Sequence, residues 1–335
     1  MTSTLTVLIA THNRAELLER ALRCINEARR PFGWEIDILV AANACSDGTH
    51  ALLEQYARDA PGGGPAGGRL RLRWIAEPRA GKSHALNAAI PLIVADRTAM
   101  VDDDHRVDAA YFEGICTAAE AFPEADIVCG RILPDWDGSE PGWVHDEGPY
   151  RIYPLPVPRY DLGDRPVRSP QETATPGGGN LVLRSSLFNV VGTFSVDYGP
   201  VGRSLAGAED QEWVLRAIAA GAIVRYVPDI VQYHYVDQTR LRTRYLLEKA
   251  YERSASVVRL SGANRRGGFL PAYLIRKVAQ YGFAAAVALN GKRRRFYLVR
   301  LAASLGEIKG SVLAARDRRR AIRRDSRPND CSPRP

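Results

Sequence analysis

The sequence predicts an α/β fold in which a mainly parallel sheet is flanked by helices and followed by a helical C-terminal region. Short apolar runs alternate with amphipathic segments through the first half of the chain, and repeated βα units of this kind form parallel sheets covered by helices. Polar clusters follow several of the apolar runs, and ligands bind at this edge of such sheets. The composition, 335 residues with 45% hydrophobic and 25% charged side chains, is that of an ordinary globular protein.

The apolar runs of the first half predict strands at regular intervals. They are Leu5–Ala10, Ile36–Ala41, Leu70–Ile75, Thr98–Val101 and Ile127–Ile132. The first helix follows Asn13, which together with Glu16 resembles a capping box, and it carries Leu18, Leu22 and Ile25 at helical spacing. The other helices expected here are Thr49–Ala60, Lys82–Ile90 and Ala109–Ala121, with a surface loop at Pro61–Gly68.

The second half is less regular. Residues 133–176 are rich in proline and aromatic residues, and we expect a long loop of a functional or mobile kind. The elements expected after it are a helix at Gln211–Ala220, strands at Ile223–Val227 and Ile230–Tyr235, and helices alone from about Arg240.

Positive charge is concentrated near the end of the chain. Residues 291–327 hold 13 Lys/Arg and three Asp/Glu, against a formal net charge of +8 for the whole protein. We expect three parts: an α/β domain over 1–240, a helical basic region over 241–327 and a disordered tail over 328–335. Five cysteines without a CxxC pair argue against a disulfide framework or a zinc site and indicate a reducing cytosol. The chain shows neither a signal-peptide pattern nor an apolar stretch of about 18 residues.

Three consecutive carboxylates follow the fourth expected strand. Asp102, Asp103 and Asp104 repel one another, so a fold that keeps them together needs a cation at this place. Mg²⁺ and Mn²⁺ take oxygen ligands and often carry a substrate diphosphate as well. A solvated turn that caps the following helix would explain the same three residues, and the triplet alone favours neither interpretation.

Glycine-based phosphate loops are not present. A dinucleotide fold needs GxGxxG after its first strand, and the chain has Thr11-His12-Asn13-Arg14 there. A P-loop needs a glycine five positions before Gly81-Lys82-Ser83, and that residue is Ala76. A bound diphosphate would therefore have to be neutralised by a metal and by side chains such as Lys82.

Three further groups each have two interpretations. Glu209 and Asp210 open a helix, where they complement the helix dipole, but one of them could act as a general base beside the glycine-rich stretch 199–207. His234 in its strand-like run is a packed residue, unless the fold brings it to the carboxylates, where imidazole suits Mn²⁺. Gly178-Gly179-Asn180 is either a plain turn or a loop whose backbone passes close to a ligand.

Seven motifs follow one another in an order that resembles a known enzyme family. They are Val7–Arg14, Val40–Thr49, Gly81–Asn87, Asp102–Asp104, Gly178–Asn180, Glu209-Asp210 with Arg216, and Pro228–His234. Over about residues 3–240 the chain is similar in this way to the family 2 inverting glycosyltransferases, which have the nucleotide-sugar-binding GT-A fold.

The resemblance implies a hexosyltransferase-type enzyme that uses a divalent metal, Mg²⁺ or Mn²⁺. Such an enzyme transfers a sugar from a nucleotide-sugar donor to a hydroxyl of a saccharide or lipid-linked acceptor in polysaccharide or glycoconjugate biosynthesis. The implied metal ligands are Asp104, Asp102 and His234, and the implied base for in-line attack by the acceptor hydroxyl is Asp210, beside Glu209. The implied nucleotide-binding residues are Thr11, Asn13, Arg14, Asn43, Asp47, Lys82, Asp102 and Asp103. The implied donor-sugar and acceptor loop is Gly178, Gly179 and Asn180.

One position departs from the family pattern. The family has an Asp just before the Asn of the second-strand motif, where it reads the uracil base, and this chain has Ala42. A UDP donor is therefore not implied, and GDP or another nucleotide stays open.

The basic C-terminal region also has two interpretations. An apolar stripe at helical spacing is formed by Leu298, Leu301, Ala302, Leu305, Ile308 and Val312, with Arg300, Ser304, Glu307 and Ser311 opposite. The stripe either packs on the rest of the protein or lies with its flanking arginines on an anionic membrane. The second interpretation would place a cytoplasmic protein at the inner face of the membrane.

Two rival functions are compatible with parts of the sequence. A sugar nucleotidyltransferase would more often carry a glycine-rich basic loop after the first strand, which this chain does not have. A basic adaptor for membranes or nucleic acid would explain the charged C-terminal region but leave the carboxylate cluster unused. No nucleic-acid partner is expected.

Overall fold

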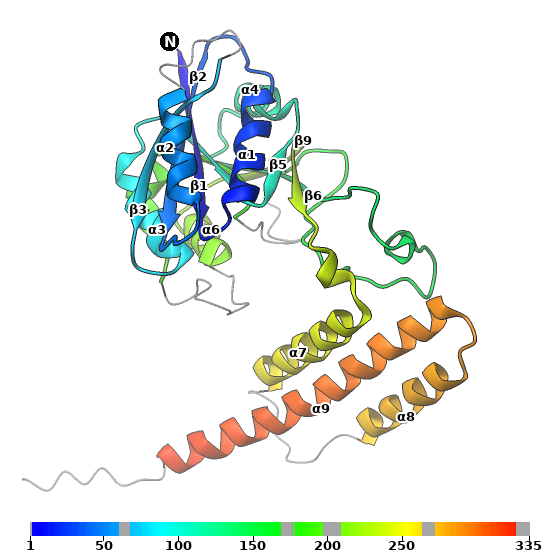
Figure 1. Cartoon of the computed structure of the whole chain (residues 1–335). Helices are drawn as coiled ribbons and strands as arrows, with labels where there is room; N and C mark the ends of the chain where they lie inside the picture. The colour runs from blue at the N-terminus through cyan, green and yellow to red at the C-terminus, as the bar shows by residue number, and fades with distance from the viewer. Residues whose placement is uncertain are drawn as a thin grey trace, which may run out of the picture. The chain divides into compact units, whose positions relative to one another are not determined.

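The computed structural model describes residues 2–59, 68–168, 176, 178–196, 209–262 and 272–325, without the side chains of 260–262 and 317–325. The expected tail 328–335, the glycine-rich stretch 199–207 and all of the expected loop Pro61–Gly68 except Gly68 lie outside the described residues. The chain forms two compact units, which Figure 1 colours along the sequence. One unit is Met1–Asp135 with Pro158–Tyr235, and the other is Trp136–Val157 with Val236–Pro335.

A single mixed sheet forms the core of the first unit, in the strand order β3-β2-β1-β4-β8-β6-β9-β5, with β7 paired to β9. The strands are β1 Ser3–Thr11, β2 Trp34–Asn43, β3 Arg71–Glu77, β4 Arg97–Val101, β5 His105–Val107, β6 Ile127–Asp135, β7 Val167–Arg168, β8 Asn180–Arg184 and β9 Val224–Tyr235. The first four strands in this order are parallel, as predicted, and β8 runs antiparallel to both of its neighbours.

The expected strands at 223–227 and 230–235 are one strand, β9. The prediction of two strands is wrong because the chain passes Pro228 and Asp229 without a turn. The interruption is absorbed instead by a register shift against β6, between Cys129 and Arg131. The long loop expected at 133–176 also begins later, because β6 continues to Asp135.

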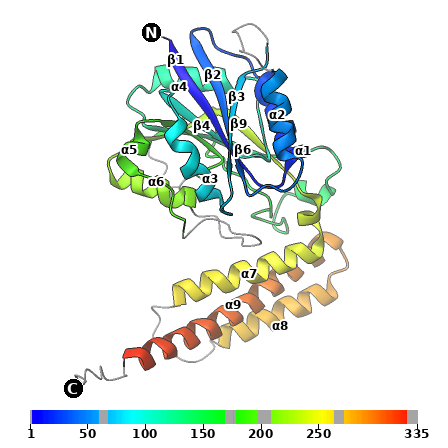
Figure 2. The same cartoon turned by 60° about the vertical axis from the view of Figure 1, so that its left-hand side comes forward.

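Helices cover both faces of the sheet, as predicted. In the first unit they are α1 Ala15–Glu27, α2 Thr49–Asp59, α3 Lys82–Ala89, α4 Tyr111–Ala121, α5 Leu187–Val191 and α6 Glu209–Ala219. Alternate residues of β1 face two different cores: Leu5, Val7 and Ile9 pack with residues of α1, α2 and α4, and Leu8 packs with residues of α3, α5 and α6. Figure 2 shows α1 and α2 on one side of the sheet and α3, α5 and α6 on the other.

The start of α1 is stabilised differently from the prediction. Asn13 does not cap it: this residue has a positive φ of 52°, and its Oδ1 accepts hydrogen bonds from the backbone N–H groups of Ser46 and Asp47. The Asp47 carboxylate accepts instead from the N–H of Ala15, and its other oxygen accepts from Thr49 at the start of α2. The expected capping box is therefore wrong, because a residue from a distant loop satisfies the helix start.

Three helices make up most of the second unit: α7 Thr243–Gly262, α8 Ala272–Val287 and α9 Gly291–Asp325. Figures 1 and 2 show α9 running between the other two, and ion pairs join Glu307 of α9 to Lys277 of α8 and Lys309 of α9 to Glu252 of α7. A small apolar cluster around Val144 and Leu241 packs segment 136–157 beside the start of this helical part.

Small residues form the most closely packed side of α9. A Cβ on Gly306 or Gly310 would overlap the backbone of α7 at Tyr251 and Ala255, so α7 and α9 approach closely only because these positions are glycine. Ser304, which the sequence analysis placed opposite the apolar stripe, is buried on α9. In the stripe itself, Leu305 and Val312 are exposed and the other members are half-buried.

Among the helices that the structure describes, none has both the length and the hydropathy needed to cross a bilayer.

Candidate active site

A cavity of about 290 Å³ lies beyond the carboxyl ends of β1, β2 and β4, at the edge where the sequence analysis expects a ligand. Its walls bring together residues from distant parts of the chain. They are Ala10, Thr11, His12, Arg14, Asn43, Ala80, Gly81, Lys82, Asp102, Asp103, Asp104 and His234. Of the expected nucleotide-binding residues, only Asn13 and Asp47 are not on these walls, and both fix the adjoining loops as described above.

Arg14 stabilises part of the carboxylate cluster. Its Nη1 donates to Asp103 Oδ1 and to Asp104 Oδ2, both at 2.9 Å, while Thr11 Oγ1 donates to Asp103 Oδ2 at 2.8 Å. Burial and the neighbouring Asp104 raise the pKa of Asp103, and Arg14 acts in the opposite direction. Hydrogen bonds from Arg14 and Thr11 therefore hold the carboxylates at the ends of β1 and β4, and the cluster is not a solvated turn.

Asn43 shapes the loop that presents Lys82. Its Oδ1 accepts from the N–H of Gly81, and its Nδ2 donates to the carbonyl of Arg79, both at 2.7 Å. The side-chain amide thereby holds the turn that begins α3, and Lys82 follows as the first residue of that helix.

Lys82 connects the carboxylate cluster to α6. Its Nζ lies 2.8 Å from Asp102 Oδ1, 3.1 Å from Asp210 Oδ2 and 3.9 Å from Glu209 Oε1. Burial lowers the pKa of Lys82, but the charges of Asp102 and Asp210 outweigh this and raise it well above the usual value. Lys82 therefore stays cationic, and two groups that lie more than 100 residues apart in sequence form one site.

Asp210 is half-buried at the start of α6. Its Oδ1 has no hydrogen-bond partner within the described part of the chain, and the same holds for Oε2 of the neighbouring Glu209. Burial is the main reason that the pKa of Asp210 is raised, with Asp102 adding to it and Lys82 opposing it. Buried carboxylates that lack a partner and have a raised pKa are typical of groups that accept a proton in a reaction.

The two glycines of the expected donor-sugar and acceptor loop lie directly against these groups. A Cβ on Gly178 would overlap the carboxylate of Asp210, and a Cβ on Gly179 would come within 2.6 Å of His105 Cε1 and 2.9 Å of Asp102 Oδ2. Only glycine permits so close an approach. The loop is therefore part of the site and not a plain turn.

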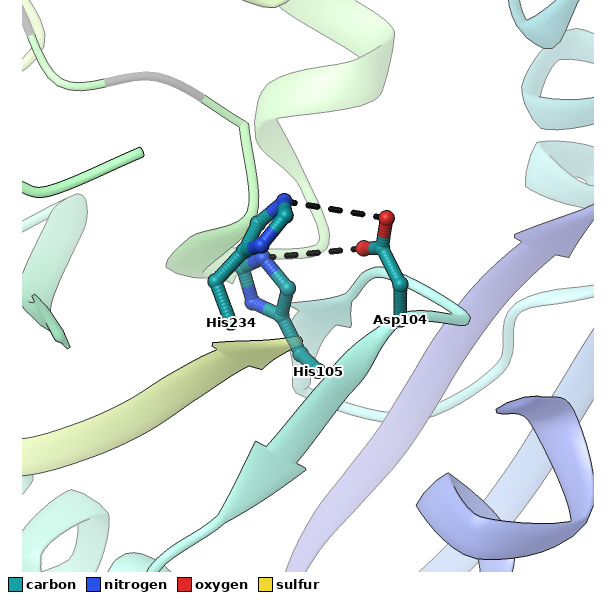
Figure 3. Close-up of side chains that lie close together, drawn as sticks. All are labelled: Asp104, His105 and His234. Carbon is teal, nitrogen blue, oxygen red and sulfur yellow. Dashed lines mark ion pairs between the residues drawn. The ribbon is translucent and has the colours of Figure 1, made fainter. Parts of the chain in front are cut away.

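A second cluster next to the cavity consists of one carboxylate and two imidazoles. Candidate ligand atoms of Asp104, His105 and His234 all lie within 4.8 Å of one another. Figure 3 shows both rings directed at the Asp104 carboxylate, whose oxygens lie 3.9 Å from His105 Nε2 and 3.6 Å from His234 Nε2. Asp102, also expected as a ligand, lies at the margin, with its Oδ2 3.9 Å from His105 Nε2 and its Oδ1 bound to Lys82.

Buried amides fix the orientation and tautomer of His105. Asn180 Nδ2 donates to the carbonyls of Arg131 and Ile230, so Asn180 Oδ1 is the atom that accepts from Gln232 Nε2 at 3.0 Å. The other atom of that amide, Gln232 Oε1, must then accept from His105 Nδ1–H at 2.6 Å. His105 Nε2, the other ring nitrogen, faces the carboxylates.

A hydrogen bond to the backbone also fixes the tautomer of His234. Its Nδ1 lies 2.6 Å from the carbonyl of Tyr235, so this nitrogen carries the proton and Nε2 carries the lone pair toward Asp104. Burial lowers the pKa of His234, which keeps the ring neutral. One carboxylate and two imidazoles held by second hydrogen bonds fit a divalent transition ion such as Mn²⁺ better than Mg²⁺, which prefers oxygen ligands.

Sequence reasoning did not find His105 or Gln232. His105 directly follows Asp104, which is a usable signal, but its place beside His234 depends on the antiparallel pairing of β5 with β9, in which His105 and His234 are direct partners. That pairing joins segments 129 residues apart and has no local signature in the sequence.

Comparison with known proteins agrees with this geometry. The family model described as glycosyl transferase family 2 matches residues 6–191. The fold is similar to that of S. aureus TarS, at 13% identity and a TM-score of 0.50 over 92% of this chain, which spans only 55% of the TarS chain. It is also similar to the mannosyltransferase PcManGT from Pyrobaculum calidifontis in complex with GDP-Man and Mn²⁺, at 18% identity and a TM-score of 0.52 over 91% of this chain and 86% of that one.

A further similar structure is S. aureus TarS 1-349 in complex with UDP-GlcNAc, at 14% identity and a TM-score of 0.50 over 95% of this chain and 92% of that one. No curated protein sequence matches the chain. These likenesses establish the GT-A fold that the motifs predicted.

Proposed function

The chain belongs to glycosyl transferase family 2 and is a glycosyltransferase, and we propose from this premise that it is metal-dependent and inverts the configuration of the sugar it transfers. The donor would be a nucleotide sugar and the acceptor a hydroxyl of a saccharide or lipid-linked glycan precursor. The observation that carries the proposal is the Lys82 bridge, which brings the Asp210 carboxylate beside the carboxylates that follow β4. The rival functions considered for the sequence, a nucleotidyltransferase and a non-enzymatic adaptor, do not agree with the family.

The donor diphosphate would be bound by positive groups in the cavity. Lys82 is held cationic by Asp102 and Asp210, so it can interact with a phosphate without losing its own charge. Asp104, His105 and His234 are the residues that would hold a divalent ion, with Asp102 at the margin. A bound ion would supply Lewis-acid stabilisation of the negative charge that develops on the leaving diphosphate.

The acceptor hydroxyl would be deprotonated by Asp210. Its Oδ1, which has no hydrogen-bond partner among the described residues, can accept a hydrogen bond from that hydroxyl, and the raised pKa makes it a stronger base than an exposed Asp. The alkoxide oxygen then forms its bond to the anomeric carbon while the bond to the donor diphosphate breaks on the opposite face. A single displacement inverts the anomeric configuration and needs no protein nucleophile.

The test is a screen of nucleotide sugars for release of the nucleotide, with and without Mn²⁺, followed by transfer to an acceptor sugar. We expect release with at least one donor, loss of activity with a chelator, and a product of inverted anomeric configuration by NMR. Retention of configuration, or full activity in the chelator, would contradict the corresponding part of the proposal.

Gly178 gives a prediction for the position of the base. Gly178→Ala should lower transfer by roughly 10²-fold, because the new methyl group displaces Asp210 and a shift of about 1 Å at a reacting group can have this effect. Gly282→Ala is the matched control, since a Cβ there meets no atom within 4 Å. Steady-state kinetics with a melting curve for each variant is the measurement. Normal turnover in a folded Gly178→Ala protein would mean that Asp210 has room to move and is not held by this loop.

Base recognition gives a second prediction. Ala42 is fully buried in the core beside β1, and its methyl group offers no hydrogen bond to a nucleobase. The neighbouring Asn43 amide is engaged by Gly81 and Arg79. We therefore expect UDP to bind no more than about tenfold, or 1.4 kcal/mol, more tightly than the best of GDP, CDP and dTDP. Competition binding measures this, and exclusive UDP binding would show that another residue reads uracil.

For the acceptor and its location we propose a role in polysaccharide or glycoconjugate assembly at the cytoplasmic face of a membrane. The high positive charge of residues 291–327 supports peripheral attachment to anionic lipid, where a lipid-linked acceptor would be presented.

A further inference from the structure

One face of α8 and the turn that follows it expose large apolar side chains. The exposed fractions are 62% for Ile275, 72% for Phe283, 55% for Val287 and 104% for Leu289. Ile275, Phe283 and Val287 are separated by eight and four residues, which places them on the same side of the helix. The opposite side carries the buried Leu274 and Ala285. Contiguous exposed apolar surface of this kind marks an interaction site in soluble proteins.

Positive charges without acidic partners adjoin this surface. Leu289 is followed within five residues by Arg293 and Arg294, which are exposed in the first turns of α9. The Arg293 guanidinium lies over the Tyr150 ring at 5.1 Å, an arrangement that leaves its N–H groups free to donate. Arg276 on α8, Arg293 and Arg294 form no ion pair with any residue that the structure describes. Residues 272–325 as a whole contain 14 Lys/Arg and three Asp/Glu.

The exposed apolar side chains and the unpaired arginines together favour an anionic membrane over a second copy of the chain. A second copy of the chain would cover the apolar side chains, but it would also bring the same unpaired arginines together, and like charges in an interface oppose binding. An anionic bilayer accommodates both features: apolar side chains enter the boundary of the acyl chains, and guanidinium groups bind lipid phosphates at the same depth.

We propose that the exposed face of α8, with Leu289 and the arginines at the start of α9, is a docking surface for anionic phospholipid. This surface is defined by Ile275, Phe283, Val287, Leu289, Arg293 and Arg294. The proposal rests on the peripheral attachment proposed above. In it, the apolar residues that contact the membrane belong to α8 and not to the stripe of α9. That stripe is half-buried apart from Leu305 and Val312, whereas the α8 side chains are 55–72% exposed.

The test is co-sedimentation of the full chain with phosphatidylcholine vesicles that either contain or omit phosphatidylglycerol. We expect binding to the anionic vesicles, at least tenfold weaker binding to the neutral ones, and weakening when salt is raised from about 0.1 to about 0.5 M, because screening shortens the range of the charges. The pair Phe283→Asp and Val287→Asp should lower binding at least tenfold. Phe32→Asp is the matched control, since Phe32 is an apolar side chain of the first unit that is even more exposed than Phe283.

Charge-reversal variants test the contribution of the arginines. Arg293→Glu with Arg294→Glu should also weaken binding to anionic vesicles at least tenfold, and Arg58→Glu, an exposed cation in the last turn of α2, should not. Circular dichroism and donor hydrolysis in solution show whether each variant is folded. If the double Asp variant does not fold, Phe283→Ser with Val287→Ser replaces it in the binding assay.

Three results would overturn the inference. If the α8 variants bind as the wild type while the arginine variants do not, residues 291–327 alone attach the protein and the earlier proposal survives without this one. Equal binding to neutral and anionic vesicles, or no binding at low salt, contradicts both. A dimer in light scattering that the α8 pair abolishes, without vesicle binding, would assign the surface to a second copy of the chain.

Discussion

Replacing Asp210 by asparagine should abolish most sugar transfer and leave donor binding almost unchanged. The amide has nearly the same shape as the carboxylate but cannot take a proton from the acceptor. Loss of a general base typically lowers the rate by about 10²–10⁴-fold. Lys82 should remain charged in the variant, because Asp102 Oδ1 lies 2.8 Å from its Nζ and is unaffected. The donor site therefore keeps its charge while the reacting group is lost.

The measurement is kcat for transfer together with the Kd of the donor nucleotide. Glu212→Gln is the matched control, since Glu212 is on the same helix but pairs with Arg216. In the wild type, the raised pKa of Asp210 should place the acid limb of the pH profile above the value of about 4 that is usual for Asp, with activity falling as the pH drops through it. Near-normal turnover in Asp210→Asn would show that Asp210 is not the base and only complements the helix dipole.

Much of the sheet could be predicted because its signals are local. Apolar runs such as those of β1 and β2 identify strands by themselves, and the rule that ligands bind at the carboxyl ends of parallel strands brings Arg14, Lys82 and Asp102–Asp104 to one edge. The structure adds the contacts between them. Lys82 was expected near a diphosphate, but its simultaneous approach to Asp102 and Asp210 depends on α3 and α6 sharing one core and could not be read from spacing.

The parts that could not be predicted depend on contacts between distant segments. Asp47 stabilises the starts of two helices at once, so the local signal at Asn13 was misleading. His105 becomes a candidate ligand only through the pairing of β5 with β9, and its tautomer depends on Gln232 and Asn180. On α9 the large apolar residues suggested the packed face, whereas close approach of two helices selected glycine at position 310.

Replacing Asp104 by asparagine should weaken metal binding while the protein still folds. Asp104 is the single carboxylate in the cluster with His105 and His234, so its neutral amide removes the only negative ligand of the three. Changes in groups that merely support a ligand weaken metal affinity by about 10–100-fold, and loss of the ligand itself should reach at least the upper part of that range. The protein should still fold, because Arg14 keeps its hydrogen bond to Asp103 and is itself partly exposed.

Calorimetric titration of nucleotide in the presence and absence of Mn²⁺ measures this effect. We expect Mn²⁺ to strengthen nucleotide binding in the wild type and in the control Asp37→Asn, whose carboxylate pairs with Arg73 away from the site, but not in Asp104→Asn. His105→Gln should also weaken the response to Mn²⁺, because it removes the ring nitrogen Nε2 that faces Asp104. Manganese-dependent binding that is unchanged in both variants would place the ion elsewhere and leave the three side chains as a hydrogen-bonded support for the end of β9.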